Sequence, residues 1–466
     1  MKALKIYIAI HLLLSFTTNA CYAAPEKIEG ALPKVNAGIT IETETLKTEI
    51  QTCLHDYYVN RKPSGTILVS VENSIIETQS FGYADKNLNI KNLTNTQYLI
   101  GSITKQFTAA ALLRALYDKA LSGGLTDNNA SALEKKLGKY LQEPISHYLP
   151  ANHTIWSGDM PKWATTITVH QLLTHTSGIP NFTSLPEYQN SIEKPLEVSG
   201  VVNYFKDKSL DFEPGSRYSY SNSGYLLLGE IVQQITGEPL NVYMHSVFFK
   251  PLDMTSTIFV TTGTVNDLKK SGQDFNNLAR AYKFDIVAEH PVPVEFEKYE
   301  QMQMQMPRGA GSLISSAPDL LKWNNSLYAG KVIPNFLLKI MLTPYISKDD
   351  KNKYYGYGIV INESERLSIY YSHNGSIPGY RSNLVYIPSL KLTIICLTNL
   401  VASEDKLEQE IKEIENKLAT GLSNKERNAK IDAELIKKYP VYSRNEELYN
   451  TRGIVDYFIK RLEVGH

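Results

Sequence analysis

Segments with the pattern of β-strands lie at both ends of this 466-residue chain, and helical patterns fill the middle. A hairpin is predicted over Ser64–Asp85, and strand-like segments return from Lys353 to Asn399. Between them, apolar residues recur every three or four positions from Ser102 to about Ala120, as in a buried helix. The two ends can share one sheet only if the intervening chain packs beside it. We therefore predict an α+β fold, with one antiparallel sheet built from the N- and C-terminal segments, flanked by helices, and an inserted, mainly helical lobe.

The domain boundaries follow from the same pattern. We expect one domain over residues 41–420, in which the sheet comes from about 41–100 and 350–420 and the lobe from about 101–349. A charged amphipathic helix is predicted near the end of this domain, and a charged extension occupies residues 421–466. Lys+Arg and Asp+Glu both number 48, so the formal charge is zero. Without a basic surplus, no nucleic-acid partner is predicted.

The first residues have the order of a secretory signal peptide. Lys2 and Lys5 precede an apolar run from about Ile6 to Phe16, and small residues follow. That run is too short to span a bilayer comfortably, and no later segment offers eighteen uninterrupted apolar residues. We therefore expect residues 1–24 to be a signal peptide, the mature chain to have no transmembrane segment, and the protein to be periplasmic or secreted.

Small residues at three positions fit cleavage of this signal, namely after Ala20, Ala23 or Ala24. A lipoprotein anchor at Cys21 is the alternative. Thr18 weakens that alternative, because a leucine is usual at its position in a lipoprotein signal.

Two cysteines, Cys53 and Cys396, remain after removal of the signal. Export would permit a disulfide between them, and two separate buried thiols are the alternative. Neither has a C-x-x-C partner, so a zinc site or a redox motif is not expected. The alternating Gln301–Met306 segment is interpreted as a strand or an extended linker rather than as soft-metal ligands. We predict neither a metal nor a cofactor.

The first predicted core helix begins with a candidate nucleophile. Ser102 and Lys105 are three residues apart and therefore lie on one face of a helix. A lysine enclosed by apolar neighbours has its charged form disfavoured and can act as a base toward the serine hydroxyl. Ser-x-x-Lys also occurs at Ser191–Lys194 and Ser403–Lys406, but only the pair at 102–105 lies on a helix apolar enough to be buried. The alternative is that Ser102 merely caps the helix.

A run of hydroxyl groups precedes a second buried helix. Tyr220 and Asn222 belong to "RYSYSNSGYLLLGEIV", in which Ser221 or Asn222 could simply cap the helix. The other interpretation is that this run supplies a proton relay to the nucleophile. Further along, His373-x-Gly375 is the only His-x-Gly in the chain and lies on a predicted strand. Gly375 would let a substrate backbone approach, and the N–H of Ser376 would then face the site.

The order Ser102-x-x-Lys105, Tyr220-x-Asn222, His373-x-Gly375 resembles the serine β-lactamase and penicillin-binding protein superfamily. It is most similar to the branch of class C β-lactamases and D-alanyl-D-alanine carboxypeptidases/esterases, because a tyrosine replaces the first serine of Ser-Asp-Asn. The stretches "FGYAD", "LLTHTSGIP", "GAGSLISSAPDLLKW" and "YGYGIV" also look like this family. The likeness covers roughly residues 41–399 and implies a β-lactamase/transpeptidase-like fold.

The resemblance implies a role for each motif residue. Ser102 would attack a carbonyl and become acylated, while Lys105 and Tyr220 would share general-base work and Tyr220 would protonate the leaving group. Asn222 would bind substrate and orient Lys105, with His373 and Gly375 lining the substrate site. The backbone N–H groups of Ser102 and Ser376 would form the oxyanion hole. The implied substrate is a small molecule or a peptide, with cell-wall peptides among the candidates.

One departure from the family pattern bears on substrate choice. The third motif commonly begins with lysine, a fixed positive charge for a substrate carboxylate, whereas His373 is mostly neutral near pH 7. We therefore expect weaker selection for carboxylate-bearing β-lactams and more room for esters, amides or D-amino-acid peptides. Arg381 is a candidate to restore the charge.

Other polar and aromatic residues near these motifs are interpreted as structural. His170 and His175 are five residues apart, which does not match metal spacing on one helix face, and His175 is expected to be structural. Trp163 and Trp323 are expected in the core, and Asp319 at a helix start.

Three functions are compatible with these features: a serine hydrolase that turns over an acyl-enzyme, a penicillin-binding or sensor protein on the same fold that does not hydrolyse, and an interaction scaffold. The three ordered motifs favour the hydrolase.

Overall fold

The computed structural model describes residues 47–48, 50–52, 64–261, 263–264, 267–268, 277–285, 294–295, 303, 307–348, 352–403, 405–418, 424–438 and 459. The predicted signal peptide with its cleavage sites, Cys21 and Cys53 lie outside these residues. None of the described helices is long and apolar enough to cross a membrane.

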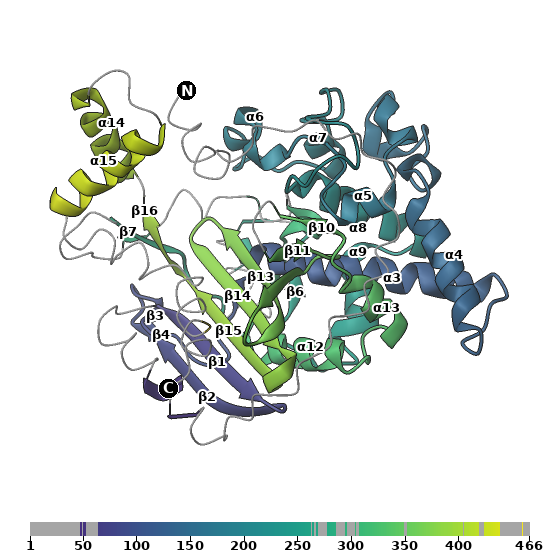
Figure 1. The fold of residues 1–466 in the computed structure, drawn as a ribbon, viewed down its shortest axis with the longest axis horizontal. Coiled ribbons are helices and arrows are strands. Elements are labelled where there is room, and N and C mark those ends of the chain that lie inside the picture. Colours follow the sequence, from purple (N-terminus) through teal and green to yellow (C-terminus); the bar gives the residue numbers. More distant parts are fainter. Residues whose placement is uncertain are drawn as a thin grey trace.

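An eight-stranded antiparallel sheet forms the centre of the molecule, with the strand order β10-β11-β12-β13-β14-β15-β1-β2 (Figure 1). Its strands are β1 (Gly65–Val71), β2 (Ser74–Phe81), β10 (Ile346–Ser347), β11 (Lys353–Tyr355), β12 (Val360–Ser364), β13 (Ser368–Ile377), β14 (Tyr380–Ile387) and β15 (Leu392–Thr398). The N-terminal hairpin β1–β2 pairs with the C-terminal β15, in register from Gly65 opposite Thr398 to Val71 opposite Leu392. The predicted sheet of two distant chain segments is thus confirmed.

The first of the strand-like segments after Lys353 is not continuous, because residues 353–364 form two strands, β11 and β12. Gly356 and Gly358 lie in the turn between them, and Gly358 has a φ of +72°, a value that L side chains rarely adopt. A Cβ on Gly358 would also lie 2.6 Å from the carbonyl oxygen of Lys105. The break brings this turn against the helix that carries Lys105.

Alternation along the central strands gives the sheet two apolar faces. Leu68, Leu384 and Ile395 belong to the main core, which the sheet shares with the helices. Their neighbours on the opposite face form a smaller cluster with residues from both outer parts of the chain: Ile50, Ile67, Val69, Val385, Ile394, Cys396 and Ile459. Ile459 therefore packs on the sheet, although it belongs to the extension that the sequence left unassigned. Cys396 is a buried thiol with no disulfide partner among the described residues, and burial raises its pKa to about 12.

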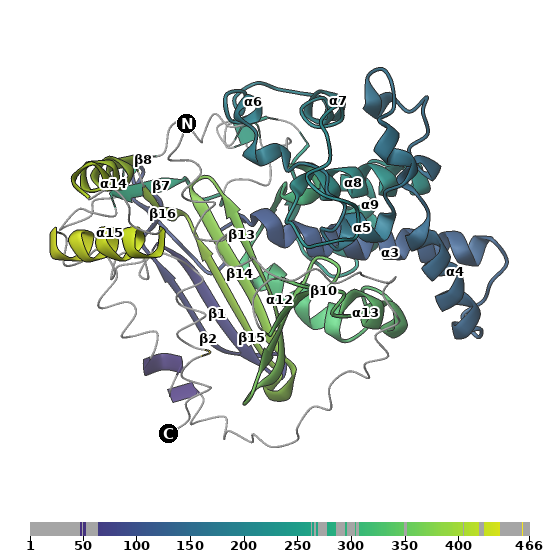
Figure 2. The same cartoon turned by 45° about the horizontal axis from the view of Figure 1, so that its top comes forward.

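Helices gather on one side of the sheet, and α3 extends from the sheet into this lobe (Figure 2). The helices are α3 (Thr104–Ser122), α4 (Ala130–Gln142), α5 (Val169–Leu173), α6 (Pro186–Gln189), α7 (Val198–Val202), α8 (Asn222–Thr236), α9 (Leu240–Met244), α12 (Ala317–Tyr328) and α13 (Asn335–Met341). Trp323 on α12 is fully buried and stacks on Phe107 of α3, with ring centroids 3.7 Å apart. Trp163 packs on the same core while half-buried.

The middle of the chain also contributes short strands. A three-stranded sheet is made of β5 (Tyr98–Leu99), β9 (Leu313–Ser315) and β6 (Ile258–Phe259), and another of β16 (Leu400–Ser403), β7 (Tyr282–Asp285) and β8 (Val294–Glu295). A small pair joins β3 (Tyr83–Asp85) to β4 (Ile90–Lys91). Helices α14 (Asp405–Lys417) and α15 (Asn424–Lys438) lie at the end of the sheet away from the lobe (Figure 1).

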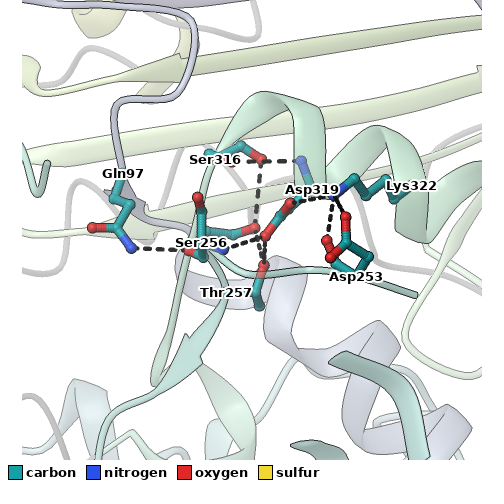
Figure 3. A network of polar contacts seen from close by, with 8 residues as sticks. Gln97, Asp253, Ser256, Thr257, Ser316, Asp319 and Lys322 are labelled. Atoms are coloured by element: carbon teal, nitrogen blue, oxygen red, sulfur yellow. Dashed lines mark hydrogen bonds and ion pairs between the residues drawn. The ribbon is translucent and has the colours of Figure 1, made fainter. Parts of the chain in front are cut away.

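Asp319 fixes the start of α12, as predicted. The hydroxyl of Ser316 caps this helix by accepting the N–H of Asp319. The Asp319 carboxylate in turn accepts the N–H of Ser256 at 2.7 Å and the hydroxyl of Thr257 at 2.9 Å (Figure 3). These bonds tie α12 to the segment before β6, so the buried carboxylate has a structural role.

Substitutions at two glycines test how closely the segment at Ile100 packs on strand β13. Gly375 lies at that contact, and Gly138 on α4 is the control. A Cβ on Gly375 in β13 would lie 1.9 Å from the carbonyl oxygen of Ile100 and 2.3 Å from Oγ of Ser382, whereas a Cβ on Gly138 in α4 would meet nothing within 4 Å. Gly375→Ala should therefore lower the free energy of unfolding by about 1–3 kcal/mol. Gly138→Ala should raise it by about 0.5–1 kcal/mol, because alanine favours the helix. Urea denaturation measures both, and equal stability of the two variants would contradict this packing.

Candidate active site

Ser102 lies in a 3-10 turn, Gly101–Ile103, that leads directly into α3. The α-helix begins at Thr104, and its N-cap residue, Ile103, makes no side-chain capping bond. The interpretation of Ser102 as a helix cap is therefore wrong. One turn on, Nζ of Lys105 lies 3.0 Å from Oγ of Ser102.

The amine of Lys105 is fully buried among uncharged groups. It donates to Oδ1 of Asn222 at 2.7 Å and to the carbonyl oxygen of Ala310 at 2.8 Å. Among the described residues, no carboxylate forms an ion pair with it. Burial therefore lowers the pKa of Lys105 well below its ordinary value. A neutral amine has two N–H bonds, which these two oxygens accept, so its lone pair is left for the hydroxyl of Ser102.

Tyr220 approaches Ser102 from the other side. Its phenol donates to Oγ of Ser102 at 2.8 Å. Burial raises the pKa of Tyr220 above its ordinary value, so the phenol is protonated at neutral pH. In the free protein Tyr220 is thus a hydrogen-bond donor and a proton source, and Lys105 is the group with a free lone pair.

The helix after Tyr220 is not capped by its own residues. Ser221 occupies the N-cap position of α8 without a side-chain capping bond, and its hydroxyl donates to the carbonyl oxygen of Ile179. Instead, Oδ1 of Asn181 accepts the backbone N–H of Asn222 at 3.0 Å. The alternative in which Ser221 or Asn222 caps the helix is therefore wrong, because a residue distant in sequence accepts this N–H.

Asn222 is oriented by the same distant segment. Its Nδ2 donates to Oδ1 of Asn181 at 3.2 Å and to Oγ1 of Thr183 at 2.9 Å. With both donors used there, Oδ1 of Asn222 faces Lys105. Sequence reasoning missed Asn181 and Thr183, although they directly follow the quoted "LLTHTSGIP".

The loop before β9 supplies the other acceptor for Lys105, Ala310. Thr108 on α3 donates to the carbonyl oxygen of Gly309 at 2.7 Å, and the N–H of Leu313 donates to Oγ1 of Thr104 at 3.2 Å. These bonds bind the loop along α3. The sequence signal was present in "GAGSL", but no pattern identifies a carbonyl oxygen as the functional group.

Strand β13 brings the backbone nitrogen of Ser376 beside the turn Gly101–Ile103, which carries Ser102. A Cβ on Gly101 would lie only 2.9 Å from the backbone nitrogen of Ser376, so the two segments approach at van der Waals distance. Ser382 on β14 holds the turn in place by donating its hydroxyl to the carbonyl oxygen of Ile100 at 2.7 Å. Ser376 itself is exposed, on the opposite face of β13 from the buried Gly375. The arrangement fits an oxyanion hole in which the N–H groups of Ser102 and Ser376 stabilise developing charge.

His373 is buried beneath the site and carries no charge at neutral pH. Its Nδ1 lies 2.7 Å from the carbonyl oxygen of Asn374, and its Nε2 lies 3.0 Å from the phenol oxygen of Tyr355. A carbonyl only accepts, so the proton is on Nδ1 and Nε2 accepts from Tyr355. Burial, and then the positive charge of Lys105, lower the pKa of His373 to about 3.

Two cationic side chains near β13, Arg381 and Lys348, could supply the positive charge that His373 lacks. The guanidinium of Arg381 donates to the carbonyl oxygens of Ile377 and Tyr380, at the turn between β13 and β14. Lys348, which the sequence did not single out, has its Nζ 5.9 Å from the ring centre of Tyr355. Its charge also lowers the pKa of His373.

The described residues therefore bring together Ser102, Lys105, Tyr220 and Asn222, with β13 alongside. A serine hydroxyl flanked by an amine lone pair and a protonated phenol is equipped for nucleophilic attack on a carbonyl followed by proton delivery to a leaving group. No group of three His, Cys, Asp or Glu side chains in the described part of the chain is placed to hold a metal ion.

The chain is similar in sequence and in fold to several known proteins. A family model described as Beta-lactamase matches residues 54–417. Penicillin-binding protein 4* of Bacillus subtilis (strain 168) is 24% identical over 357 residues, covering 76% of this chain and 72% of that protein. Protein flp of Staphylococcus aureus (strain NCTC 8325 / PS 47) is 25% identical over 377 residues, covering 77% of this chain but less than two thirds, 64%, of that protein. The crystal structure of D-amino acid amidase from Ochrobactrum anthropi SV3 with D-phenylalanine is 25% identical, with a TM-score of 0.59, and the match covers 84% of this chain and 99% of that one.

The pH dependence of Ser102 reactivity tests the state of Lys105. Because the base acts only when deprotonated, the rate of modification by a fluorophosphonate should rise with pH through the pKa of Lys105, well below the ordinary lysine value. His373 should add no inflection above about pH 4, since its pKa is about 3. Mass spectrometry of the labelled protein over a pH series measures this profile.

Lys105→Arg is the control, because a guanidinium stays protonated and should leave Ser102 unreactive at every pH. A wild-type profile that rises only near the ordinary lysine pKa would contradict a neutral amine at rest.

Proposed function

Because this chain belongs to the Beta-lactamase family, we propose that it is an exported serine hydrolase that works through an acyl-enzyme on Ser102. The observation that carries the proposal is the pair of contacts on Oγ of Ser102, from Nζ of Lys105 at 3.0 Å and from the phenol of Tyr220 at 2.8 Å. A simple structural serine does not need both a neutral amine and a buried phenol.

The proposed acylation uses each group once. Lys105 takes the hydroxyl proton while Oγ of Ser102 bonds to the substrate carbonyl carbon, and the carbonyl oxygen becomes an oxyanion held by the N–H groups of Ser102 and Ser376. As the tetrahedral intermediate collapses, the bond to the leaving amine or alcohol breaks, and that group takes the proton of Tyr220. The Lys105 ammonium then returns its proton to the phenolate, so neither side chain changes its protonation over the step.

Water releases the acyl group by the reverse sequence. A water molecule attacks the ester carbonyl, gives up a proton to the Tyr220–Lys105 pair, and Oγ of Ser102 leaves with a proton. Asn222 holds the Lys105 amine throughout, because its amide is fixed by Asn181 and Thr183.

For the substrate, we propose amides, esters or D-amino-acid peptides rather than carboxylate-bearing β-lactams. His373 stands where the family commonly has lysine, and its neutral, buried imidazole offers no charge to a carboxylate. The similarity to a D-amino acid amidase is consistent with this preference. Export is proposed on the N-terminal sequence alone, with lipoprotein anchoring at Cys21 as the alternative.

A penicillin-binding or sensor protein that acylates without turnover is the second candidate. The similarity to penicillin-binding protein 4* favours it. The two functions differ in deacylation. They can be distinguished by whether the acyl group on Ser102 is hydrolysed and released.

A substrate panel tests the proposed function. Wild-type protein should hydrolyse p-nitrophenyl esters and D-amino-acid amides, and should act only weakly on a chromogenic cephalosporin. Ser102→Ala should lower kcat by about 10³-fold or more, since the nucleophile is lost. Ser122, at the exposed end of α3, gives the matched control, and Ser122→Ala should keep full activity.

Fluorescent penicillin that labels Ser102 and is not released, with no turnover of any ester or amide, would favour the sensor. Efficient cephalosporin hydrolysis would overturn the substrate preference, and activity in Ser102→Ala would overturn the mechanism.

A further inference from the structure

His175 makes three separate contacts with Tyr220 and with the residues on either side of it. Its carbonyl oxygen accepts the N–H of Ser219 at 2.9 Å, and its Nδ1 accepts the N–H of Ser221 at 3.2 Å. Between these bonds, the imidazole packs on the ring of Tyr220, with centroids 4.3 Å apart. One residue thus holds the position before Tyr220, the position after it, and the ring itself.

The backbone of His175 is in a conformation that needs a reason. Its φ is +59°, in the left-handed region that non-glycine residues adopt only at an energetic cost. The same residue directs both its carbonyl and its imidazole toward the segment 219–221. Such a local cost persists only where the surrounding structure imposes it, and it is commonest at functional sites.

The imidazole of His175 also carries an unused donor. Because Nδ1 accepts a hydrogen bond, the proton of the neutral ring is on Nε2. Nε2 is buried and has no hydrogen-bond partner among the described residues. Around it the rings of Tyr355, Tyr225 and Tyr218 have centroids 4.7, 5.1 and 5.8 Å from the imidazole. An unpartnered buried donor is unfavourable, so ordinary packing does not explain a histidine here.

We propose that His175 is a positioning residue that directs the phenol of Tyr220 toward Ser102. The inference rests on the proposed function. It assigns a role to a residue that was expected from the sequence to be structural. His175 does not touch Ser102 or Lys105 through any hydrogen bond described for it, so it acts through Tyr220. Loosening any of its three contacts would let the phenol move away from Oγ of Ser102.

His170 offers a matched comparison in the same segment. It is a neutral histidine on α5, and its Nδ1 lies 2.7 Å from the phenol oxygen of Tyr357. Burial lowers its pKa to about 4. Its ring contacts are with Tyr345 and Tyr357, and none is with Tyr220. A substitution at His170 therefore removes a comparable side chain without altering a ring contact of Tyr220.

The test compares His175→Asn, Tyr220→Phe and the double variant with His170→Asn. Asparagine keeps an acceptor for the N–H of Ser221 and tolerates a positive φ, but it lacks the ring that packs on Tyr220. Each variant is assayed on a D-amino-acid amide, whose leaving group needs a proton, and on a p-nitrophenyl ester, whose leaving group does not. Melting temperatures and the rate of Ser102 phosphonylation are measured in parallel.

If His175 positions the phenol, His175→Asn should lower kcat/KM, which reports acylation alone, by about 10- to 100-fold on the amide and by less than about threefold on the activated ester. Deacylation also uses Tyr220, so kcat is not the quantity compared. In the Tyr220→Phe background the same substitution should have no further effect, because the group it positions is absent. His170→Asn should leave both activities near the wild-type values.

Three results would overturn the proposal. Equal losses on both substrates, additive effects in the double variant, or a His175→Asn enzyme no slower than His170→Asn would each show that His175 has only a structural role. These differ from failure of the proposed function, in which wild-type protein is neither phosphonylated at Ser102 nor active on any substrate, a result that would remove the basis of the inference as well.

Discussion

Removing the amine of Lys105 from water is the constraint on which the rest of the site depends. A buried ammonium without a carboxylate partner is costly, and a neutral amine in the same place is not. The two oxygens that surround it, on Asn222 and Ala310, satisfy two N–H bonds and leave the lone pair toward Ser102. The proposed reactivity of Ser102 thus depends on how completely the start of helix α3 is enclosed, and any change that admits water or an acidic group near Nζ should remove it.

The fold maintains this enclosure by packing three distant segments against the start of α3. The turn 356–359 lies against the carbonyl of Lys105, the loop 309–313 runs along the helix, and β13 approaches the nucleophile turn at Gly101. Glycines stand where these segments meet, because a Cβ at Gly358 or Gly375 would overlap backbone atoms. The pairing of an N-terminal hairpin with C-terminal strands supports the candidate site, since β13 and β14 belong to the same sheet and lie beside the turn that carries Ser102.

Much of this arrangement could be predicted from the sequence, and the exceptions share a cause. The strand periods at both ends predicted the sheet, and the spacing of Ser102 and Lys105 predicted that they share a helix face. The interpretation of Ser221 or Asn222 as the cap of α8 was wrong because Asn181, which is far from the helix along the chain, accepts the first N–H. The carbonyl of Ala310 and the contacts of His175 were missed for a similar reason, since they depend on backbone geometry and tertiary packing, which leave no pattern of residue types. The split of the strand at Gly358 was signalled by "YGYG" but needed the contact with Lys105 to explain it.

The protonation state of Lys105 is the quantity that most directly tests this account. Protein carrying ¹⁵N at lysine Nζ can be titrated by NMR, with the resonance of Lys105 assigned by its loss in Lys105→Arg. We expect Lys105 to titrate well below the ordinary lysine value, so that its amine is neutral in the pH range where Ser102 reacts. A Lys105 that titrates together with the exposed lysines would contradict it, because Ser102 would then face an ammonium rather than a base.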